Sequence, residues 1–422
     1  MLNNSPTPFL PSTRREFLRR SASGIGLLAF SRFAPSFLVN AASAAVPAPE
    51  KDRTILVLVQ LAGGNDGLNT LVPFTDANYR RLRPTIGIPD TQVLRISDAL
   101  GLHPSCAAMQ GLFHDGRLGI VQNVGYPNPN HSHFRSTEIW ETASASSDFM
   151  STGWIGRYLD NACSGRPAAS HDPLAIHLNT LNGEPETFIG QREHPTFGLL
   201  AGAGMRREND ETRRLLETIA GAPGAPNAEE GFLQHTLMDS LVTEGKVQTV
   251  LGSYRPAAAY PATPFAAALR NIAALVAGGL PTRVYFVSLN GFDTHVNQAA
   301  THADRLKVLS EGLAAFQGDL QAHRLDGQVM TMTFSEFGRR PSENESKGTD
   351  HGTAAPLFVM GSRVSGGLHG TPPALNLAAN QDVAFSTDFR SVYATMLADW
   401  LGSPPEPVLG GKFTTLPLVR TA

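Results

Sequence analysis

The amino-acid sequence predicts an α/β protein in which a mostly parallel sheet lies between two layers of helices, a three-layer α/β/α sandwich. Apolar runs without polar alternation recur along the chain, and Gly, Asn or Asp residues bound each of them, as is typical of strands buried on both faces. Helical patterns separate these runs, so strand and helix alternate as they do in parallel sheets. Ligands of such sheets bind beyond the carboxyl ends of the strands, so the residues that follow each run are the candidate site residues.

The predicted elements follow in chain order. The clearest strands are expected at residues 54–61, 118–122, 283–289, 329–334 and 356–360. Helices are expected between them at residues 106–114, 137–143, 303–322 and 388–401. From about residue 164 to 281 the pattern becomes helical, and the expected helices are at 208–219, 230–251 and 265–277. This region is predicted to be a helical insertion, because the sheet pattern resumes cleanly after it.

The N-terminus predicts export. Residues 12–18 match the S/T-R-R-x-F-L form of a twin-arginine signal, a moderately apolar stretch follows at 21–39, and Ala42-Ser43-Ala44 offers a small-x-small cleavage site. The alternative is a basic amphipathic helix of the mature protein. The apolar stretch contains Ser, Gly and Arg and is too weak for a stable membrane span. The sequence therefore predicts a signal peptide at 1–44, the twin-arginine translocase as partner during export, a periplasmic or secreted location, and a mature α/β domain at 51–422.

Composition suits a globular protein. Charged residues make up 17% of the chain, below the roughly 25% of an average domain, while 40 Gly and 30 Pro residues indicate long ordered loops. The formal net charge of −3 and the scattered basic residues leave no electrostatic footprint for nucleic acid, so no such partner is expected. The two cysteines, Cys106 and Cys163, could pair after export, but they are too few for a disulfide framework and lack the spacing of a thiolate metal site.

Carboxylates and imidazoles stand beside several of the predicted strands. Asp66 lies in a Gly-Gly-Asn-Asp-Gly segment after the first strand, which could equally be a turn without chemistry and lacks the Gly-Lys-Ser/Thr ending of a P-loop. Asp293 and His295 follow the third strand, and Asp350 and His351 precede the last one. Such side chains bind Zn²⁺ or Mn²⁺, so the sequence predicts a divalent metal site that contains all five.

Glu336 is a further predicted metal ligand. It ends the apolar run at 329–334, which should be wholly buried. Burying an unpaired carboxylate is costly, so Glu336 is expected to have a cationic partner, either the metal or Arg339.

Ser132 stands between His131 and His133, just before a helical run. The free N–H groups and the dipole of a helix N-terminus favour an anion, so Ser132 could be a nucleophile or could hold an anionic group. The alternative is that Ser132 simply caps the helix, which leaves both neighbouring histidines unexplained. His133 could act as a general acid or base.

The order of these motifs resembles the alkaline phosphatase superfamily, and more closely an exported bacterial family within it that is known mainly as a domain of unknown function. The segments that carry the resemblance span nearly the whole mature chain: Gly63-Gly64-Asn65-Asp66-Gly67, Ser132-His133-Phe134, Gly291-Phe292-Asp293-Thr294-His295, Ser335-Glu336-Phe337-Gly338-Arg339 and Gly348-Thr349-Asp350-His351-Gly352. The resemblance implies an alkaline-phosphatase-like fold with Asp66, Asp293 and His351 at metal-ligand positions. It places Ser132 at the nucleophile position, where Ser136 is close enough to compete.

Two departures from the superfamily pattern matter. Active phosphatases and sulfatases of the superfamily have Asp-His-Gly where this chain has Glu336-Phe337-Gly338, so an imidazole is missing and the cofactor is expected to be one or two divalent ions. The Cys/Ser-x-Pro-x-Arg signature of formylglycine sulfatases is also missing from the sequence, which disfavours that class.

The predicted function is an exported metal-dependent hydrolase of phosphate- or sulfate-type esters of a small molecule or carbohydrate. The ion would polarise the ester oxygen, Ser132 would attack phosphorus or sulfur, and Arg339 or Arg135 would stabilise the transition-state charge. Two alternatives stay open. One is a non-catalytic exported protein that binds a carbohydrate or a protein partner, and the other is a metal-dependent hydrolase of a different bond, such as a carboxylic ester.

Overall fold

The computed structural model describes residues 53–162, 173–180, 183–199, 218, 243–378 and 381–420. The predicted signal peptide, Cys163 and the helix predicted at 208–219, apart from Thr218, lie outside these residues. Of the helix predicted at 230–251, residues 243–251 are described and are helical. The chain divides into two compact units, one of Met1–Ala45 with Ala203–Thr249 and one of Val46–Gly202 with Val250–Ala422. The second unit contains the sheet and the candidate site.

A nine-stranded sheet forms the centre of this second unit. The strands predicted from the apolar runs are confirmed as β1 (Ile55–Ala62), β5 (Leu118–Gly125), β8 (Val284–Asn290), β9 (Val329–Phe334) and β10 (Ala355–Met360). Along the sheet the order is β11-β5-β10-β9-β1-β8-β6-β7, and β12 also pairs with β5. Within β1, Leu58 lies opposite Phe286 on one side and opposite Met332 on the other, both in parallel register. Because β1 is central and covered on both faces, its residues are almost uniformly apolar and buried.

Two strands lie in the segment from about 164 to 281, for which only helices were predicted. They are β6 (Ala175–Leu178) and β7 (Thr196–Leu199), and β6 pairs with β8 in parallel, so this segment extends the main sheet. Each strand has only four residues, too few to establish a period in the sequence. The division of the mature chain into a domain and an insertion stays a prediction.

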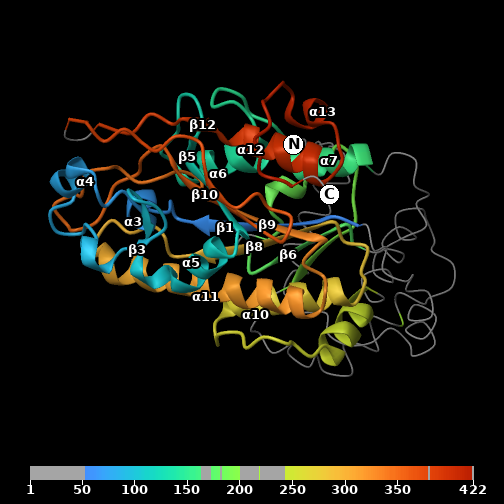
Figure 1. The fold of residues 1–422 in the computed structure, drawn as a ribbon. Helices are drawn as coiled ribbons and strands as arrows, with labels where there is room; N and C mark the ends of the chain where they lie inside the picture. Colours follow the sequence, from blue (N-terminus) through green and yellow to red (C-terminus); the bar gives the residue numbers. More distant parts are fainter. Residues whose placement is uncertain are drawn as a thin grey trace, which may run out of the picture. The chain divides into compact units, whose positions relative to one another are not determined.

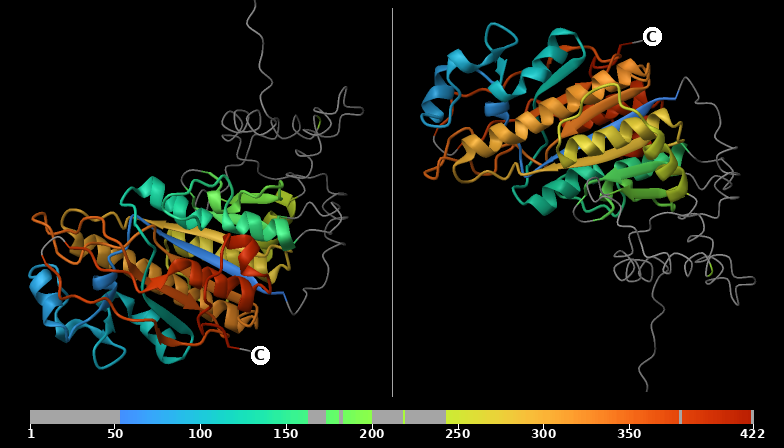
Figure 2. Two further views of the ribbon diagram at one scale, coloured as in Figure 1. Left: turned by 90° about the horizontal axis from the view of Figure 1, so that it is seen from above. Right: turned by 90° about the horizontal axis from the view of Figure 1, so that it is seen from below.

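Helices cover both faces of the sheet, as the predicted sandwich requires (Figure 1). On one face lie α5 (Ala107–His114), α10 (Pro264–Ala277) and α11 (Gln298–Ala322), and on the other lie α6 (His133–Thr142), α7 (Trp154–Ala162), α12 (Phe389–Thr395) and α13 (Pro405–Leu409). Figure 2 shows the two helical layers from opposite sides of the sheet. Among the helices that the structure describes, none combines the length and apolar character that a bilayer-spanning segment requires.

The remaining elements are short. A separate three-stranded sheet has the order β2-β4-β3, and two small strands lie at the edge of the main sheet beside β5. These strands are β2 (Leu71–Val72), β3 (Leu94–Arg95), β4 (Gly101–Leu102), β11 (Gly367–His369) and β12 (Thr387–Asp388). The short helical pieces are α3 (Gly67–Thr70), α4 (Ala77–Leu82), η1 (Asp90–Gln92), η2 (Pro104–Cys106), η3 (Glu186–Phe188) and the π-turn η4 (Met396–Trp400). Cys106 is buried, and its pairing with Cys163, which lies outside the described residues, stays a prediction.

The direction of β10 explains where its flanking residues lie. It runs antiparallel to both β9 and β5, so its beginning lies at the same edge of the sheet as the ends of the neighbouring strands. Residues just before Ala355 therefore meet residues just after Phe334 and Asn290. Helix α6 reaches this edge as well, and its packing fixes its position: Trp140 stacks on Phe389 with ring centroids 4.3 Å apart.

Candidate functional site

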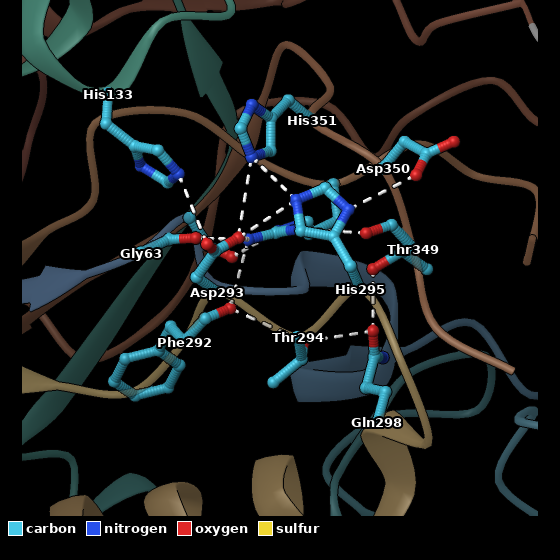
Figure 3. A network of polar contacts seen from close by, with 12 residues as sticks. Gly63, His133, Phe292, Asp293, Thr294, His295, Gln298, Thr349, Asp350 and His351 are labelled. Atoms are coloured by element: carbon cyan, nitrogen blue, oxygen red, sulfur yellow. Dashed lines mark hydrogen bonds and ion pairs between the residues drawn. The ribbon is translucent and has the colours of Figure 1, made fainter. Parts of the chain in front are cut away.

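Asp293 lies at the centre of a histidine cluster at this edge of the sheet (Figure 3). Its Oδ1 atom is 3.0 Å from Nε2 of His295 and 3.4 Å from Nε2 of His351, and its Oδ2 atom is 3.5 Å from Nε2 of His133. The three histidines come from the loop after β8, the segment before β10 and the start of α6. His133, Asp293 and His351 each offer one ligand atom, and these atoms lie within 4.8 Å of one another. The structure thus unites residues that are far apart in the sequence.

The other ring nitrogen of each histidine is held by an oxygen atom. Nδ1 of His133 is 2.9 Å from Oε1 of Glu336, and Nδ1 of His295 is 3.2 Å from Oδ1 of Asp350. Nδ1 of His351 donates to the backbone carbonyl of His131 at 2.7 Å. Metal-binding histidines commonly donate their second N–H to a carboxylate or a carbonyl, which fixes the tautomer and the orientation of the ring.

The position of the proton on His351 shows that this histidine offers a lone pair to a cation. A carbonyl oxygen can only accept, so Nδ1 of His351 carries the proton. Burial and the charge of Arg339 lower the pKa of His351, which keeps the ring neutral and leaves a lone pair on Nε2. That lone pair faces Nε2 of His295 at 2.9 Å and the Asp293 carboxylate at 3.4 Å. A metal ion among these atoms would satisfy all of them at once, so the donor set fits a divalent cation.

Arg339 is buried behind Asp293 and does not face a substrate. Its side chain has no exposed area, and Nη2 donates to Asp293 Oδ1 at 2.6 Å. The rest of the guanidinium is occupied by four backbone carbonyls, those of Gly63, Gly64, Phe292 and Thr349. Burial opposes ionisation of Asp293, but the hydrogen bond and charge of Arg339 outweigh it and hold the pKa of Asp293 below its usual value. The predicted role of Arg339 in stabilising transition-state charge is therefore replaced by a role in positioning Asp293.

Glu336 has a basic neighbour, the imidazole of His133, which is neither of the two partners that the sequence suggests. The buried carboxylate accepts from the backbone N–H of Gly63 at 2.8 Å and lies against Nδ1 of His133. The hydrogen bond to Glu336 is the main reason that the pKa of His133 is raised. Gly63 must be glycine, because its φ is +121° and a Cβ atom there would lie 2.3 Å from the backbone nitrogen of Asp293. Glu336 and Asp350 thus each contact the Nδ1 atom of a histidine of the cluster, and their role as metal ligands stays a prediction.

Asp66 is not brought to the cluster. It is fully buried, its Oδ2 atom forms an ion pair with Arg83 at 2.6 Å, and Gln298 also donates to this oxygen. Burial alone would raise the pKa of Asp66, but the Arg83 charge and hydrogen bond give a net lowering. The charge of Asp66 is neutralised by a buried arginine outside the cluster, and its role as a metal ligand stays a prediction that this arrangement does not support.

The two candidate serines differ sharply. Ser136 is buried, with its hydroxyl 2.6 Å from the Tyr126 hydroxyl, and it donates to the Glu336 carbonyl at 2.6 Å. It is therefore a structural residue rather than a nucleophile. Ser132 is exposed at the N-cap position of α6, and its hydroxyl makes no capping hydrogen bond. The simple capping interpretation of Ser132 is thus not supported, and its role as a nucleophile stays a prediction.

His133 is a possible metal ligand that the sequence analysis did not include in its ligand set. The sequence suggests an acid or base at this position, whereas the structure places its Nε2 atom within the group of possible ligand atoms. The available signal was the pair of histidines around Ser132, which helix capping leaves unexplained.

Residues 53–408 match the sequence profile of a family described as "Protein of unknown function (DUF1501)". The chain belongs to the DUF1501 family. No curated protein matches the sequence.

Several solved structures are similar to this DUF1501 chain at low identity. The C-terminal periplasmic domain of EcEptC from Escherichia coli, in complex with Zn, has a TM-score of 0.36 and 8% identity over 75% of each chain. The PsFucS1 sulfatase from Pseudoalteromonas sp. has a TM-score of 0.35 and 11% identity over 92% of this chain and 75% of that one. The alkaline phosphatase from the Antarctic bacterium TAB5 has a TM-score of 0.30 and 10% identity over 75% of this chain and 95% of that one. Similarity at this level does not identify an activity.

A cavity of about 560 Å³ adjoins the cluster of the DUF1501 chain. His133, Asp293 and Glu336 form the part of its wall that belongs to the cluster, and α6 and the segment at 183–186 form much of the rest. A volume in this range is typical of small-molecule sites. The cluster is therefore accessible to a ligand of modest size.

Proposed function

We propose that this DUF1501 chain is a metal-dependent hydrolase of phosphate- or sulfate-type esters that works with one divalent ion. One observation carries the proposal: three imidazoles from separate segments are each anchored through Nδ1 and turn Nε2 toward the same carboxylate. The proposed ligands are His133, Asp293, His295 and His351. Imidazole-rich sets with one carboxylate favour Zn²⁺ over Mn²⁺, which prefers oxygen ligands.

The ion would supply Lewis-acid polarisation of the ester oxygen and would offset the charge that develops there. Glu336 and Asp350 would act as positioning residues that keep two of the imidazoles in the correct tautomer. In this arrangement His133 holds the ion, which replaces its predicted role as a general acid or base.

Ser132 is the nucleophile in this proposal. Its hydroxyl is exposed, has no capping partner and precedes His133 directly. Arg135, the other residue considered for charge stabilisation, is engaged by Glu138 at 2.5 Å and by the backbone carbonyl of Asp148 at 2.5 Å. With both candidate arginines committed elsewhere, the ion is the main source of positive charge for the transition state.

Metal analysis of the purified mature protein tests the proposal. Wild-type protein should contain about one Zn²⁺ per chain, and His351→Ala should lose it, while His114→Ala, which changes an exposed histidine of α5, should retain it. A panel of phosphate, phosphonate, sulfate and carboxylic esters should then give turnover with the wild type and none with Ser132→Ala. Retention of the metal in His351→Ala would overturn the assignment. Bound metal without turnover on any ester would favour the alternative of a binding protein.

Export through the twin-arginine pathway is also proposed. It is supported by the Ser12-Thr13-Arg14-Arg15-Glu16-Phe17-Leu18 segment and by the Ala42-Ser43-Ala44 cleavage candidate. Replacing both arginines by lysine should leave the uncleaved chain in the cytoplasmic fraction, and N-terminal sequencing of the exported wild-type chain should begin near Ala45. Normal export of the double variant would exclude this route.

A further inference from the structure

The cavity beside the histidine cluster is strongly acidic. Six carboxylates line it, and none of its lining residues, as far as the structure describes them, is a lysine or an arginine. The carboxylates are Glu138, Glu141, Glu184, Glu186, Asp293 and Glu336. Such a wall would repel additional anionic groups on a substrate.

Three of these carboxylates have a basic partner. Glu138 pairs with Arg135, Asp293 with the buried Arg339, and Glu336 with His133. These pairs account for half of the acidic wall, and Glu141 and Glu184 are among its other carboxylates.

Glu141 is the main indication that the cavity binds a cation. It is only 6% exposed, and it lies on the cavity wall at the end of α6. Its carboxylate accepts from the backbone N–H of Thr187, at 3.1 Å from Oε2, and from that of Glu186, but no lysine or arginine in the described part of the chain pairs with it. A buried carboxylate without a cationic partner is costly, and a cation in the cavity would remove that cost. Glu184, exposed on the same wall, accepts from the Thr196 hydroxyl and adds negative charge.

The aromatic ring of Phe134 is a second feature of the cavity that suits a cation. Phe134 is 88% exposed, which is unusual for a large apolar side chain, and it also lines the cavity. It belongs to the same helix as Glu141. An aromatic face beside carboxylates is the combination by which proteins recognise ammonium groups.

We infer that this cavity binds the ammonium group of a substrate whose ester group lies at the histidine cluster. This inference rests on the proposed function, because the cluster supplies the place for the reacting ester. It narrows the substrate class to esters that carry a primary or quaternary amine, and it disfavours esters with additional phosphate, sulfate or carboxylate groups.

Binding of a matched pair of small molecules to the full-length mature protein tests the inference. The probes are choline and 3,3-dimethylbutan-1-ol, which has nearly the same shape but no charge, and isothermal titration calorimetry gives both affinities. Choline should bind about tenfold more tightly than the alcohol, since carboxylate and aromatic contacts to a cation are together worth about 1.4 kcal/mol or more. Glu141→Gln and Glu184→Gln should each reduce this preference, while Glu406→Gln, which changes an exposed acid of α13, should leave it intact.

The outcomes separate this inference from the proposed function when metal content is measured on the same samples. Metal-loaded protein that binds both probes equally would overturn the ammonium site and leave the metal centre standing. Selective choline binding by protein that takes up no metal would support the ammonium site and overturn the hydrolase proposal. Binding of the neutral disaccharide cellobiose in preference to choline would show that the wall recognises hydroxyl groups instead. Because Glu184 is exposed, its variant keeps the test decisive even if the Glu141 variant does not fold.

Discussion

Replacing Glu141 by glutamine should stabilise the protein in a pH-dependent way. Burial raises the pKa of Glu141 from 4.5 to about 7, with smaller contributions from the neighbouring Glu186 and Glu336 charges. Because a tenfold change in proton affinity corresponds to about 1.4 kcal/mol, the difference between a pKa of 4.5 and one of about 7 corresponds to about 3 kcal/mol. Glutamine keeps an oxygen that can accept from the Thr187 N–H, but it cannot ionise.

The sign of the effect follows from proton binding. Between pH 4.5 and about 7 the folded protein holds a proton on Glu141 that the unfolded chain has released, so stability falls as the pH rises through this window. At about pH 4 the carboxyl is protonated in both states, and the wild type and Glu141→Gln should have similar free energies of unfolding. At about pH 8 the full difference of about 3 kcal/mol should appear in favour of the variant.

Urea denaturation of both proteins at several pH values, without choline or related amines, measures this difference. Glu406→Gln provides a matched control, because the side chain is exposed and its replacement should have little effect at any pH. A difference between Glu141→Gln and the wild type that does not change with pH would mean that Glu141 is ionised in the folded protein or has a cationic partner there. Either result would remove the reason for expecting a cation in the cavity.

Three further substitutions test the assignments around the cluster. Asp350→Asn should weaken metal binding about 10- to 100-fold, because His295 loses the carboxylate that orients it, and competition with a chelator would measure the change. Arg339→Lys should lower the free energy of unfolding by about 3 kcal/mol, since lysine cannot reproduce the planar set of hydrogen bonds, and urea denaturation would show it. Asp66→Asn should destabilise the fold by about 3 kcal/mol or more by leaving a buried arginine unpaired, yet should retain one metal per chain by elemental analysis. Metal loss in a folded Asp66→Asn protein would return Asp66 to the ligand set.

The sequence analysis located the edge of the sheet that carries the site. Uninterrupted apolar runs identify buried strands, and the residues beside them fall at one edge because parallel strands share a direction. Asp293, His295 and His351 follow from this reasoning. Helix and strand boundaries were predicted less well: α6 begins at His133 rather than at residue 137, because the only apolar residue of its first turn, Phe134, is exposed and gives no helical period of buried residues.

The roles of individual carboxylates could not be read from the sequence. Asp66 and Glu336 both stand beside strands, yet one pairs with Arg83 and the other orients His133. Which partner a carboxylate takes depends on side-chain directions set by tertiary packing, and no local pattern records them. The acidic cavity escaped the sequence analysis for the same reason, since Glu141 and Glu184 come from segments that meet only in the folded chain.

In the proposed metal centre, Phe337 is the main reason to expect one ion rather than two. It stands where superfamily phosphatases and sulfatases are expected to have an imidazole, and its buried ring lies 4.9 Å from that of His133 and 4.5 Å from that of His351. An apolar ring in this place offers no lone pair, but it packs against two proposed ligands and helps to hold their orientation. The other residue that could have served a second ion, Asp66, is neutralised by Arg83. A second ion would therefore lack both its nitrogen ligand and its carboxylate, while the first keeps three anchored imidazoles and Asp293.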